Sequence, residues 1–515
     1  MGETLHLGRL DAVILIGYVV MLASIGWWAA HRTHKTTEDY FLANRSIPWL
    51  VTTASFMATC ISALTFIGTP AEGYGSDFRY LLSNPGDILA TIFIAMVFLP
   101  HFQKLRVTSI YQATAERFGQ SVRTTCSGYF LITRSLASTV RIVAIAKVLE
   151  VVSNGSISYP LCVGIVVLGI LAYTTMGGGR AIAWTDLMQF TLLITGALSA
   201  LYYIVSQVPG GVAAIVETGK HAVAADGTIY NKFNFLELYK WENLSILILM
   251  VVWGFFNSSA AYGTDQDMMQ RLLACNDNRK ARWSLMLVGL VSIPIALLFL
   301  SIGVGLYAYA QVHPELIAGM RDNDHIFPRF ILTVMPHGLR GLLLAAVASA
   351  AMGSADSALA SLSTAFTLDF YKPFWGKDAD EQKMVRVSKL SFVGFGLFFM
   401  VCAMLLKNLD NLLWLAFRII TFTYGPLLGI FCVTIMTDWK LSARKVIGLM
   451  LTPTVITFSL AMIAWWMSTH GGGGIWVPLH KTYWRLYSIF GTLFVPLGAW
   501  LLRDRDPAVP KAQNA

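Results

Sequence analysis

The residues Ala348–Phe366 read ASAAMGSADSALASLSTAF, and this stretch decides what kind of protein the chain forms. It combines small side chains, several hydroxyls and one acid, Asp356, in a region that is otherwise apolar. Of all 515 residues, 56% are hydrophobic and 13% are charged, a composition that argues against a soluble protein. The composition therefore predicts an integral membrane protein, in which a carboxylate inside a span needs a partner.

Apolar runs long enough to cross a lipid bilayer recur from Ala12 to Leu502. A helix needs about 20 apolar residues to span a hydrocarbon core of roughly 30 Å, and about thirteen runs reach that length. The predicted spans are 12–31, 48–71, 79–102, 123–153, 157–178, 181–207, 246–272, 281–311, 338–370, 389–407, 411–436, 443–468 and 483–502. The longest polar connection, 209–242, is predicted to be a loop rather than a separate domain.

The lysines and arginines are distributed unevenly between the loops. One alternating set of loops is rich in cations, as in Arg279, Lys280 and Arg282, whereas the other set mixes fewer cations with acids, as in Lys240 and Glu242. The positive-inside rule then predicts an N-terminus outside the cell and a C-terminus in the cytoplasm. This asymmetry accounts for the net charge of +9 without any nucleic-acid partner.

Two predicted spans contain small polar patches with a glycine at mid-membrane. The second span contains ATCISALTFIGTP and the seventh contains WGFFNSSAAYGTD. An unsatisfied backbone group in hydrocarbon costs several kcal/mol, so we expect both spans to be interrupted where they face protein or a watery cavity. Spans two and seven are five apart, a spacing typical of transporters with two inverted repeats. The alternative is that the small residues form helix-packing surfaces.

Six motifs stand in a characteristic order along the chain: EDYFLANRSIPW, ATCISALTFIGTPAEGYG, YTTMGGGRAIAWTDLMQF, GTDQDMMQR, GSADSALASLST and YGPLLGIF. Through these motifs nearly the whole chain resembles the sodium/solute symporter family, which includes sugar, proline, iodide, vitamin and monocarboxylate carriers. The forms GTDQDMMQR and SADSAL are more similar to the iodide, multivitamin and monocarboxylate branch than to the sugar branch.

The resemblance implies an all-α, LeuT-like fold in which spans two to eleven form two inverted five-helix repeats. One additional helix precedes this core and two follow it. The segments are an N-terminal helix and cytoplasmic loop at 1–47, a first repeat at 48–207, an extracellular loop at 208–245, a second repeat at 246–436, two C-terminal helices at 437–502 and a cytoplasmic tail at 503–515.

Sodium is a hard cation that prefers oxygen ligands, and the ninth span offers a stripe of hydroxyls at Ser354, Ser357, Ser361 and Thr364. Such a stripe is also compatible with helix packing and bonding to the preceding turn. The resemblance implies a common sodium site formed by Ala58, Ile61, Ala350, Gly353 and Ser354. Gly353 departs from the family, which usually has a serine there, so one side-chain ligand is missing; water or Asp356 could substitute for it.

Asp186 is a second acid within a predicted span, and such acids are functional candidates because insertion costs about 3 kcal/mol. The resemblance implies that Asp186 faces the ninth span, where Asp356 and Ser357 would complete a second sodium site. The alternative is a structural salt bridge from either acid to Arg141 or Arg418.

Three arginines, Arg134, Arg141 and Arg418, lie in or near spans and point to an anionic solute, because a guanidinium suits a carboxylate better than a neutral sugar. Arg134 is placed either beside Arg141 on one face of the fourth span or at its cytoplasmic end. The predicted solute-binding residues are Ser62, Thr65, Asn84, Arg141, Ser258 and Arg418.

The sequence therefore predicts a multi-pass cell-membrane protein, not an enzyme, that imports a small polar solute together with Na⁺ by alternating access. An organic anion is the expected solute, and a sugar or polyol is the alternative. A solute sensor and an uncoupled uniporter are rivals of another class. Neither an organic cofactor nor an obligate protein partner is predicted. The sequence contains no P-loop, so ATP is not expected to drive transport, and the six cysteines have no paired spacing that would indicate disulfides or a metal site.

Overall fold

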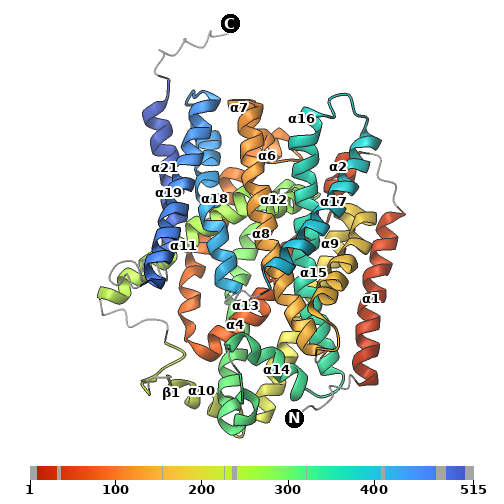
Figure 1. Ribbon diagram of the computed structural model, residues 1–515, viewed down its shortest axis with the longest axis vertical. Coiled ribbons are helices and arrows are strands. Elements are labelled where there is room, and N and C mark those ends of the chain that lie inside the picture. Colours follow the sequence, from red (N-terminus) through yellow and green to blue (C-terminus); the bar gives the residue numbers. More distant parts are fainter. Residues whose placement is uncertain are drawn as a thin grey trace.

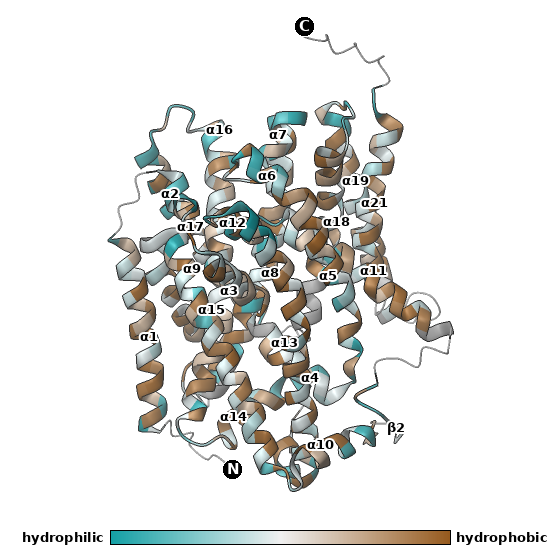
Figure 2. Cartoon of the chain, turned by 180° about the vertical axis from the view of Figure 1, so that it is seen from behind, coloured by the Kyte–Doolittle hydropathy of each residue, from teal (hydrophilic) through white to brown (hydrophobic). Residues whose placement is uncertain are grey.

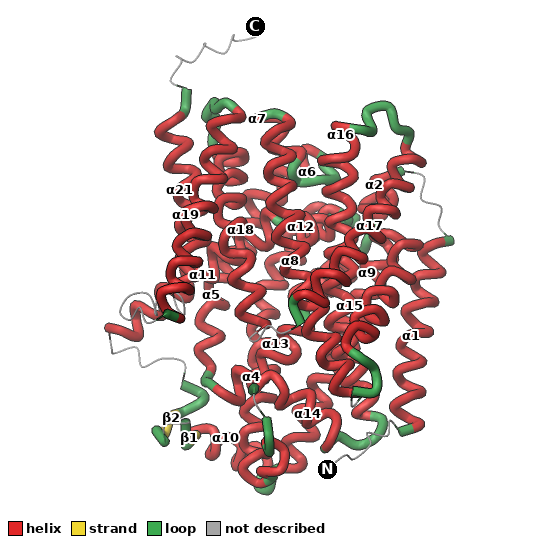
Figure 3. Tube along the Cα trace, viewed as in Figure 1, coloured by secondary structure: helices red, strands yellow, loops and turns green. Residues whose placement is uncertain are grey.

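The structure, a computed structural model, describes residues 8–31, 36–153, 155–224, 227–234, 241–320, 322–407, 412–470 and 483–504. This part of the chain is almost entirely helical (Figure 3). Its strands are β1 (Ala222–Val223) and β2 (Ile229–Tyr230), which pair in an antiparallel hairpin with Ala222 opposite Tyr230. The predicted all-α class is therefore confirmed for the described residues.

The long helices follow the predicted apolar runs in order. They are α1 (Arg9–Ala30), α3 (Trp49–Cys60), α4 (Ala63–Gly75), α5 (Asn84–Phe93), α8 (Gln120–Val152), α9 (Tyr159–Gln207), α11 (Trp241–Thr264), α13 (Asn278–Val312), α15 (Leu339–Ala365), α17 (Glu381–Leu405), α18 (Leu412–Met436), α19 (Ala443–Thr469) and α21 (Leu486–Leu502).

Shorter helical segments connect or extend the long ones. They are α2 (Thr37–Leu42), η1 (Ala43–Arg45), η2 (Phe78–Ser83), η3 (Ile94–Phe98), α6 (Leu99–Leu105), α7 (Gln112–Phe118), α10 (Gly211–Lys220), α12 (Gln266–Leu273), η4 (Pro314–Ile317), η5 (Asn323–His325), α14 (Ile326–Thr333), η6 (Phe366–Tyr371), α16 (Lys372–Phe374) and η7 (Tyr483–Arg485).

Ten helices in the described part of the chain are long and apolar enough to cross a membrane. An eleventh span results if the bent pair Trp49–Cys60 and Thr65–Gly75 is counted as one. Two shorter apolar helices are α21 itself and the first part of α9, Tyr159–Thr175, which a kink at Gly178 (φ 57°) separates from the rest of α9. The protein is therefore a multi-pass membrane protein. The start of α1 and the end of α21 lie at opposite ends of the bundle (Figure 1).

Helix α15 contains almost all of the stretch Ala348–Phe366 and lies inside the bundle. It packs against α9, α8, α1, α17 and α3, and residues 353–359 are all buried. Small residues allow this close approach: a Cβ atom at Gly196 of α9 would lie only 2.9 Å from the Cβ of Ala346. The peripheral helices instead expose large apolar side chains such as Leu390 and Val455, as expected for surfaces that contact lipid (Figure 2).

The second predicted span is broken as expected. Helix α3 ends at Cys60, Ile61 has non-helical angles (φ −89°, ψ 82°), and α4 starts after Ser62. The hydrogen bonds across the break run from Ile61 N to the Met57 carbonyl and from Phe66 N to the Ser62 carbonyl. Among the described residues, no hydrogen-bond donor reaches the carbonyl oxygens of Ala58 or Ile61, so both can bind an ion.

The seventh predicted span is also interrupted, at the last residue of the patch WGFFNSSAAYGTD. Helix α11 runs without interruption through the patch around Ser258, and the break lies at Asp265 (φ −88°, ψ 120°). The hydroxyls of this segment do not open the helix, since Thr264 Oγ1 donates to the Ala260 carbonyl at 2.7 Å. Asp265 instead caps the following helix, α12, by accepting from Asp267 N.

The polar connection predicted at 209–242 is more structured than a simple loop, because it contains α10 and the β1–β2 hairpin; its residues 235–240 lie outside the described part. Lys232, which is fully buried, packs against the end of α4. Its Nζ atom donates to the carbonyls of Tyr74 (2.6 Å) and Ser76 (3.1 Å). Burial lowers the pKa of Lys232 to about 8. This lysine fixes the carboxyl end of the second half of the broken span.

Candidate functional site

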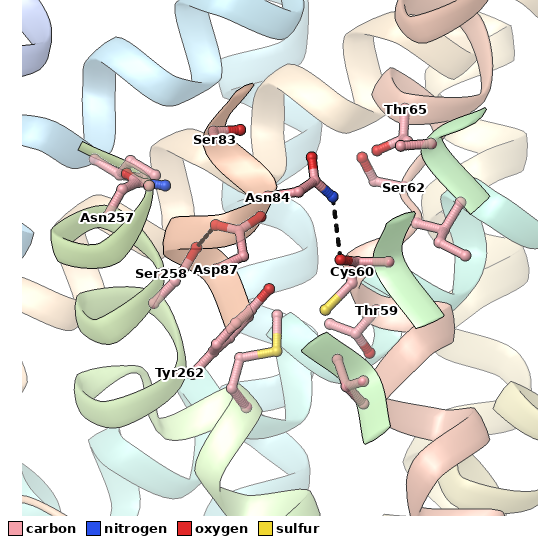
Figure 4. A pocket seen from close by; sticks show the side chains of 18 of the residues that line it. Thr59, Cys60, Ser62, Thr65, Ser83, Asn84, Asp87, Asn257, Ser258 and Tyr262 are labelled. Carbon is pink, nitrogen blue, oxygen red and sulfur yellow. Dashed lines mark hydrogen bonds between the residues drawn. The ribbon is translucent and has the colours of Figure 1, made fainter. Parts of the chain in front are cut away.

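A cavity of about 230 Å³ lies in the middle of the bundle, beside the break between α3 and α4. The other walls come from α5, α8, α11, α13 and α18 (Figure 4). Its polar and charged lining residues are Thr59, Cys60, Ser62, Thr65, Thr69, Tyr80, Ser83, Asn84, Asp87, Arg134, Arg141, Asn257, Ser258, Tyr262, Asp265, Ser292 and Tyr424. The break exposes the residues around Ile61 to this space, as an interrupted span requires.

The structure brings five of the six predicted solute-binding residues to this cavity: Ser62, Thr65, Asn84, Arg141 and Ser258. Asn84 donates through Nδ2 to Ser292 Oγ at 3.2 Å. Arg418 does not line the cavity; its guanidinium lies over the ring of Trp484, with 5.8 Å between the guanidinium carbon and the ring centroid.

Two charged lining residues neutralise each other, and the sequence did not reveal this. Arg134 donates through Nη1 to Asp265 Oδ2 at 3.3 Å and through Nη2 to Asp267 Oδ2. All three side chains are buried, and Tyr424 also donates to Asp265. Arg134 therefore lies at the cavity beside the break before α12, and the alternative position at a cytoplasmic helix end was wrong.

Arg141 differs from Arg134 in having no ion-pair or hydrogen-bond partner among the described residues. Its Nη1 atom is buried and unsatisfied. Seven residues separate the two arginines, so they project from the same face of α8, and both reach the cavity as predicted. An unpaired guanidinium in a protein interior is unfavourable unless a ligand completes it.

Asp87 is a charged lining residue that the sequence analysis did not predict. It follows Asn84 by one turn of α5, and Ser258 of α11 donates to its Oδ1 atom (Figure 4). No arginine or lysine of the described chain forms a salt bridge with it. The signal was present, because an acid inside the predicted span 79–102 is a functional candidate for the same reason as Asp186.

The residues predicted for the common sodium site lie on elements that pack together, since α15 contacts both α3 and α4. Ser354 Oγ donates to the carbonyls of Ala350 (3.3 Å) and Ala351 (3.2 Å) within α15. Gly353 is in contact with α9: a side chain at this position would collide with Gln189 Oε1 and would lie 3.3 Å from Asp186 Oδ1.

Gln189 therefore occupies the space that a serine at position 353 would need. It is 1% exposed, and neither its amide oxygen nor its amide nitrogen has a hydrogen-bond partner in the described part of the chain. Asp186 Oδ1 is likewise buried and unsatisfied. Two free oxygens thus face one point beside Gly353, an arrangement that suits a hard cation. Gln189 lies one residue before the end of the motif YTTMGGGRAIAWTDLMQF, three positions after Asp186.

The partner of Asp186 is Arg271, which was not predicted. Arg271 Nη2 donates to Asp186 Oδ2 at 3.0 Å, and Ser55 Oγ donates to the same oxygen at 2.6 Å. Among the described residues, neither Arg141 nor Arg418 forms a salt bridge with Asp186 or Asp356. Arg271 pairs with Asp186 instead, and it lies on α12, the helix that begins after the interruption at Asp265.

Asp356, the acid within Ala348–Phe366, accepts hydrogen bonds but forms no salt bridge with any described residue. Tyr173 Oη donates to Asp356 Oδ2 at 2.6 Å, and the backbone N–H of Ser357 donates to Oδ1 at 2.5 Å. Ser357 Oγ donates to the Gly353 carbonyl at 2.8 Å. Ser357 also lines a second cavity, of about 30 Å³, together with Arg271.

Buried charges form a continuous chain from the neighbourhood of Gly353 to the main cavity. Arg271 pairs with Asp186 (3.0 Å) and Asp267 (3.4 Å), and Arg134 then joins Asp267 to Asp265. Arg271 Nε also donates to Thr59 Oγ1 at 2.9 Å, near the end of α3. Helices α3 and α12 are thus linked through hydrogen bonds from Arg271 as well as through apolar packing, and Figure 2 shows the hydrophilic character of α12.

Comparison with known proteins gives a consistent result. The sequence model of the Sodium:solute symporter family matches residues 40–445. A sodium/sialic acid symporter of Proteus mirabilis is 28% identical over 451 residues, which are 86% of this chain and 88% of that protein. Human sodium-coupled monocarboxylate transporter 1 is 27% identical over 455 residues, which are 85% of this chain and 71% of that protein.

The solved structures include a substrate-bound, outward-open Na⁺-coupled sialic acid symporter. It superimposes with a TM-score of 0.80 at 25% identity and covers 96% of this chain and 97% of its own. The predicted resemblance and the relation to LeuT-fold sodium-coupled symporters are therefore confirmed.

Proposed function

The chain belongs to the Sodium:solute symporter family, and we propose that its solute is a small organic anion, such as a carboxylate, imported with Na⁺ by alternating access. Sodium-coupled symport of a small solute follows from the family and its relatives. The one observation that supports an anion is Arg141, whose guanidinium lines the central cavity without a protein partner. Its planar donors match a carboxylate in two parallel hydrogen bonds.

The relatives are compatible with this class of solute. One relative is named for sialic acid and another for monocarboxylates, and both names denote acids. The second candidate is a sugar or polyol, which is supported by the uncharged polar lining at Ser62, Thr65 and Asn84. We further propose thirteen spans, an odd number that agrees with the start of α1 and the end of α21 lying at opposite ends of the bundle (Figure 1), and an N-terminus outside the cell from the positive-inside rule.

The experiment that separates these candidates is counterflow in proteoliposomes, with sodium or potassium in the medium and a panel of small carboxylates, hexoses and amino acids as competitors. We expect carboxylates to exchange only in sodium. A hexose that exchanges when no carboxylate does would contradict the anionic solute. Exchange that is independent of sodium would identify a uniporter, and solute-induced thermal stabilisation without any exchange would identify a sensor.

For the common sodium site we propose the carbonyls of Ala58 and Ile61 with Ala350 and Ser354, and we expect Ser354→Ala to weaken sodium dependence more than Ser361→Ala. Ser361 Oγ donates to the Ala358 carbonyl at 2.9 Å and serves as the matched control on the same helix. Loss of one hydroxyl ligand should raise the half-saturating sodium concentration about tenfold, which corresponds to ~1.4 kcal/mol. Uptake measured against sodium concentration is the test, and equal values in both variants would show that the hydroxyl stripe serves packing.

We propose a second sodium ion at Asp186 Oδ1 and Gln189 Oε1, close to Asp356 and Ser357. Asp186→Asn and Gln189→Leu should both lower the number of sodium ions carried per solute, because each removes one of the two unsatisfied oxygens at Gly353. Reversal potentials of proteoliposomes give the ratio. Ser55→Ala is the control, since this hydroxyl bonds only the other oxygen of Asp186. An unchanged ratio in the two ligand variants, with transport intact, would eliminate the second ion.

A further inference from the structure

Four charged side chains line the central cavity, and their formal charges cancel. Arg134 and Asp265 are paired with each other, at 3.3 Å. The remaining two, Arg141 on α8 and Asp87 on α5, form no salt bridge within the described chain. The cavity therefore presents one unpaired cation and one unpaired anion on different walls, and a solute that bears only a carboxylate would satisfy one of them.

Asp87 has unused hydrogen-bonding capacity. A carboxylate can accept about four hydrogen bonds, two at each oxygen. Within the described part of the chain Asp87 has a single side-chain donor, Ser258, which bonds Oδ1. The nearby amide of Asn84 donates instead to Ser292, and Figure 4 shows Asp87 between Asn84 and Tyr262 at the edge of the open space. Oδ2 of Asp87 is thus available to a donor that enters the cavity.

An acid in this position discriminates strongly between solutes. When a solute without a donor excludes water from the cavity, the carboxylate of Asp87 loses its hydration and gains nothing in return. Sites that hydrogen-bond a substrate hydroxyl or amine reject analogues that lack the group, because a buried polar group is then left unpaired. Asp87 therefore weakens the binding of carboxylates that have no hydrogen-bond donor outside the carboxylate group.

We infer that the solute carries, in addition to the carboxylate that binds Arg141, a hydrogen-bond donor that binds Asp87. This inference rests on the proposed anionic solute and narrows it to acids with an ammonium or hydroxyl group on the part of the molecule remote from the carboxylate. Amino acids and polyhydroxylated acids belong to this class, whereas unsubstituted short-chain acids do not. An ammonium and a hydroxyl group can each donate a hydrogen bond to Asp87, and the variants described below distinguish between these two donors.

The test is binding of matched acids to the purified full-length protein in saturating sodium, measured by thermal shift and calorimetry. Within a set, the unsubstituted acid, its hydroxylated form and its amino form share one carbon skeleton, and successive sets increase in chain length. Sialic acid is the polyhydroxylated probe. In the wild type we expect at least one donor-bearing acid to bind about tenfold or more tightly than its unsubstituted counterpart.

The variants identify the residue and the donor. Asp87→Ala should abolish the preference for donor-bearing acids, and Asp87→Asn, which keeps the shape and one acceptor, should retain it for a hydroxyl but lose it for an ammonium. Thr91→Val, one turn further along α5 and outside the cavity lining, is the control and should keep the wild-type preference. Sodium-induced thermal stabilisation checks that each variant is folded.

The possible failures are distinguishable. If unsubstituted acids bind as tightly as their donor-bearing forms, and Asp87→Ala changes neither, the role of Asp87 is refuted while the anionic solute stands. If no acid of any set binds although sodium still stabilises the protein, the anionic solute itself is refuted, and this inference with it.

Discussion

Replacement of Arg134 by methionine is expected to destabilise the protein by about 3–5 kcal/mol and to abolish transport, because it leaves uncompensated buried charge. Arg134 is 4% exposed, and the carboxylates that it binds, Asp265 and Asp267, are each 1% exposed. Asp267 retains Arg271 at 3.4 Å, but among the described residues Asp265 retains only uncharged donors such as Tyr424. The apparent melting temperature of the protein in detergent measures the effect.

A matched control for this variant lies on the same helix. Arg141→Met removes a guanidinium that has no protein partner in the described chain, so it should not lower the melting temperature. Addition of Asp265→Asn and Asp267→Asn to Arg134→Met should recover much of the lost stability, because a neutral network replaces the stranded acids. A melting temperature of Arg134→Met equal to that of the wild type would show that these ion pairs contribute no net stability.

The second large effect is expected at the solute. Arg141→Gln should weaken the binding of the transported acid by about 30-fold or more, since truncation of one partner in a buried charge pair costs 2–5 kcal/mol. Arg141→Lys should restore part of the affinity, because it returns the charge without the two parallel donors. Sodium-dependent thermal stabilisation should persist in both variants, since Arg141 on α8 is not one of the proposed ion ligands.

The comparison variant for this prediction is Arg418→Gln. Arg418 was expected from sequence to bind the solute, but it packs over Trp484 and does not line the cavity. It should therefore change the dissociation constant much less than Arg141→Gln does. Wild-type affinity for the acid in Arg141→Gln, measured by calorimetry, would contradict the proposed role of Arg141.

The helices were predictable because the membrane acts on each segment separately. The run 281–311 became α13 (Asn278–Val312) and the run 443–468 became α19 (Ala443–Thr469), within a few residues at each end. A segment crosses lipid if it is long and apolar, and this property is local to the sequence. The break after Cys60 was predictable for a similar reason, since small polar residues and glycine mark helices that face a cavity.

The site was only partly predictable. Residues one helical repeat apart, such as Arg134 and Arg141, were correctly placed on one face. Their different roles were hidden, because Asp265 and Asp267 lie 131 and 133 residues further along the chain. The contact of Gln189 with Gly353 was hidden in the same way, since it depends on how α9 and α15 are rotated against each other.

The sequence by itself determined that this is a multi-pass membrane protein of the sodium:solute symporter family, with a broken second span and acids and arginines inside its helices. Only the tertiary structure decided that Arg271 neutralises Asp186, that Arg134 is paired, and that Arg141 and Asp87 line the cavity without a salt bridge to any described residue. The physical reason is that one residue turns a helix by about 100°, so a partner depends on the rotation and axial position of two packed helices. Hydropathy, in contrast, sums along one helix and is almost insensitive to that rotation.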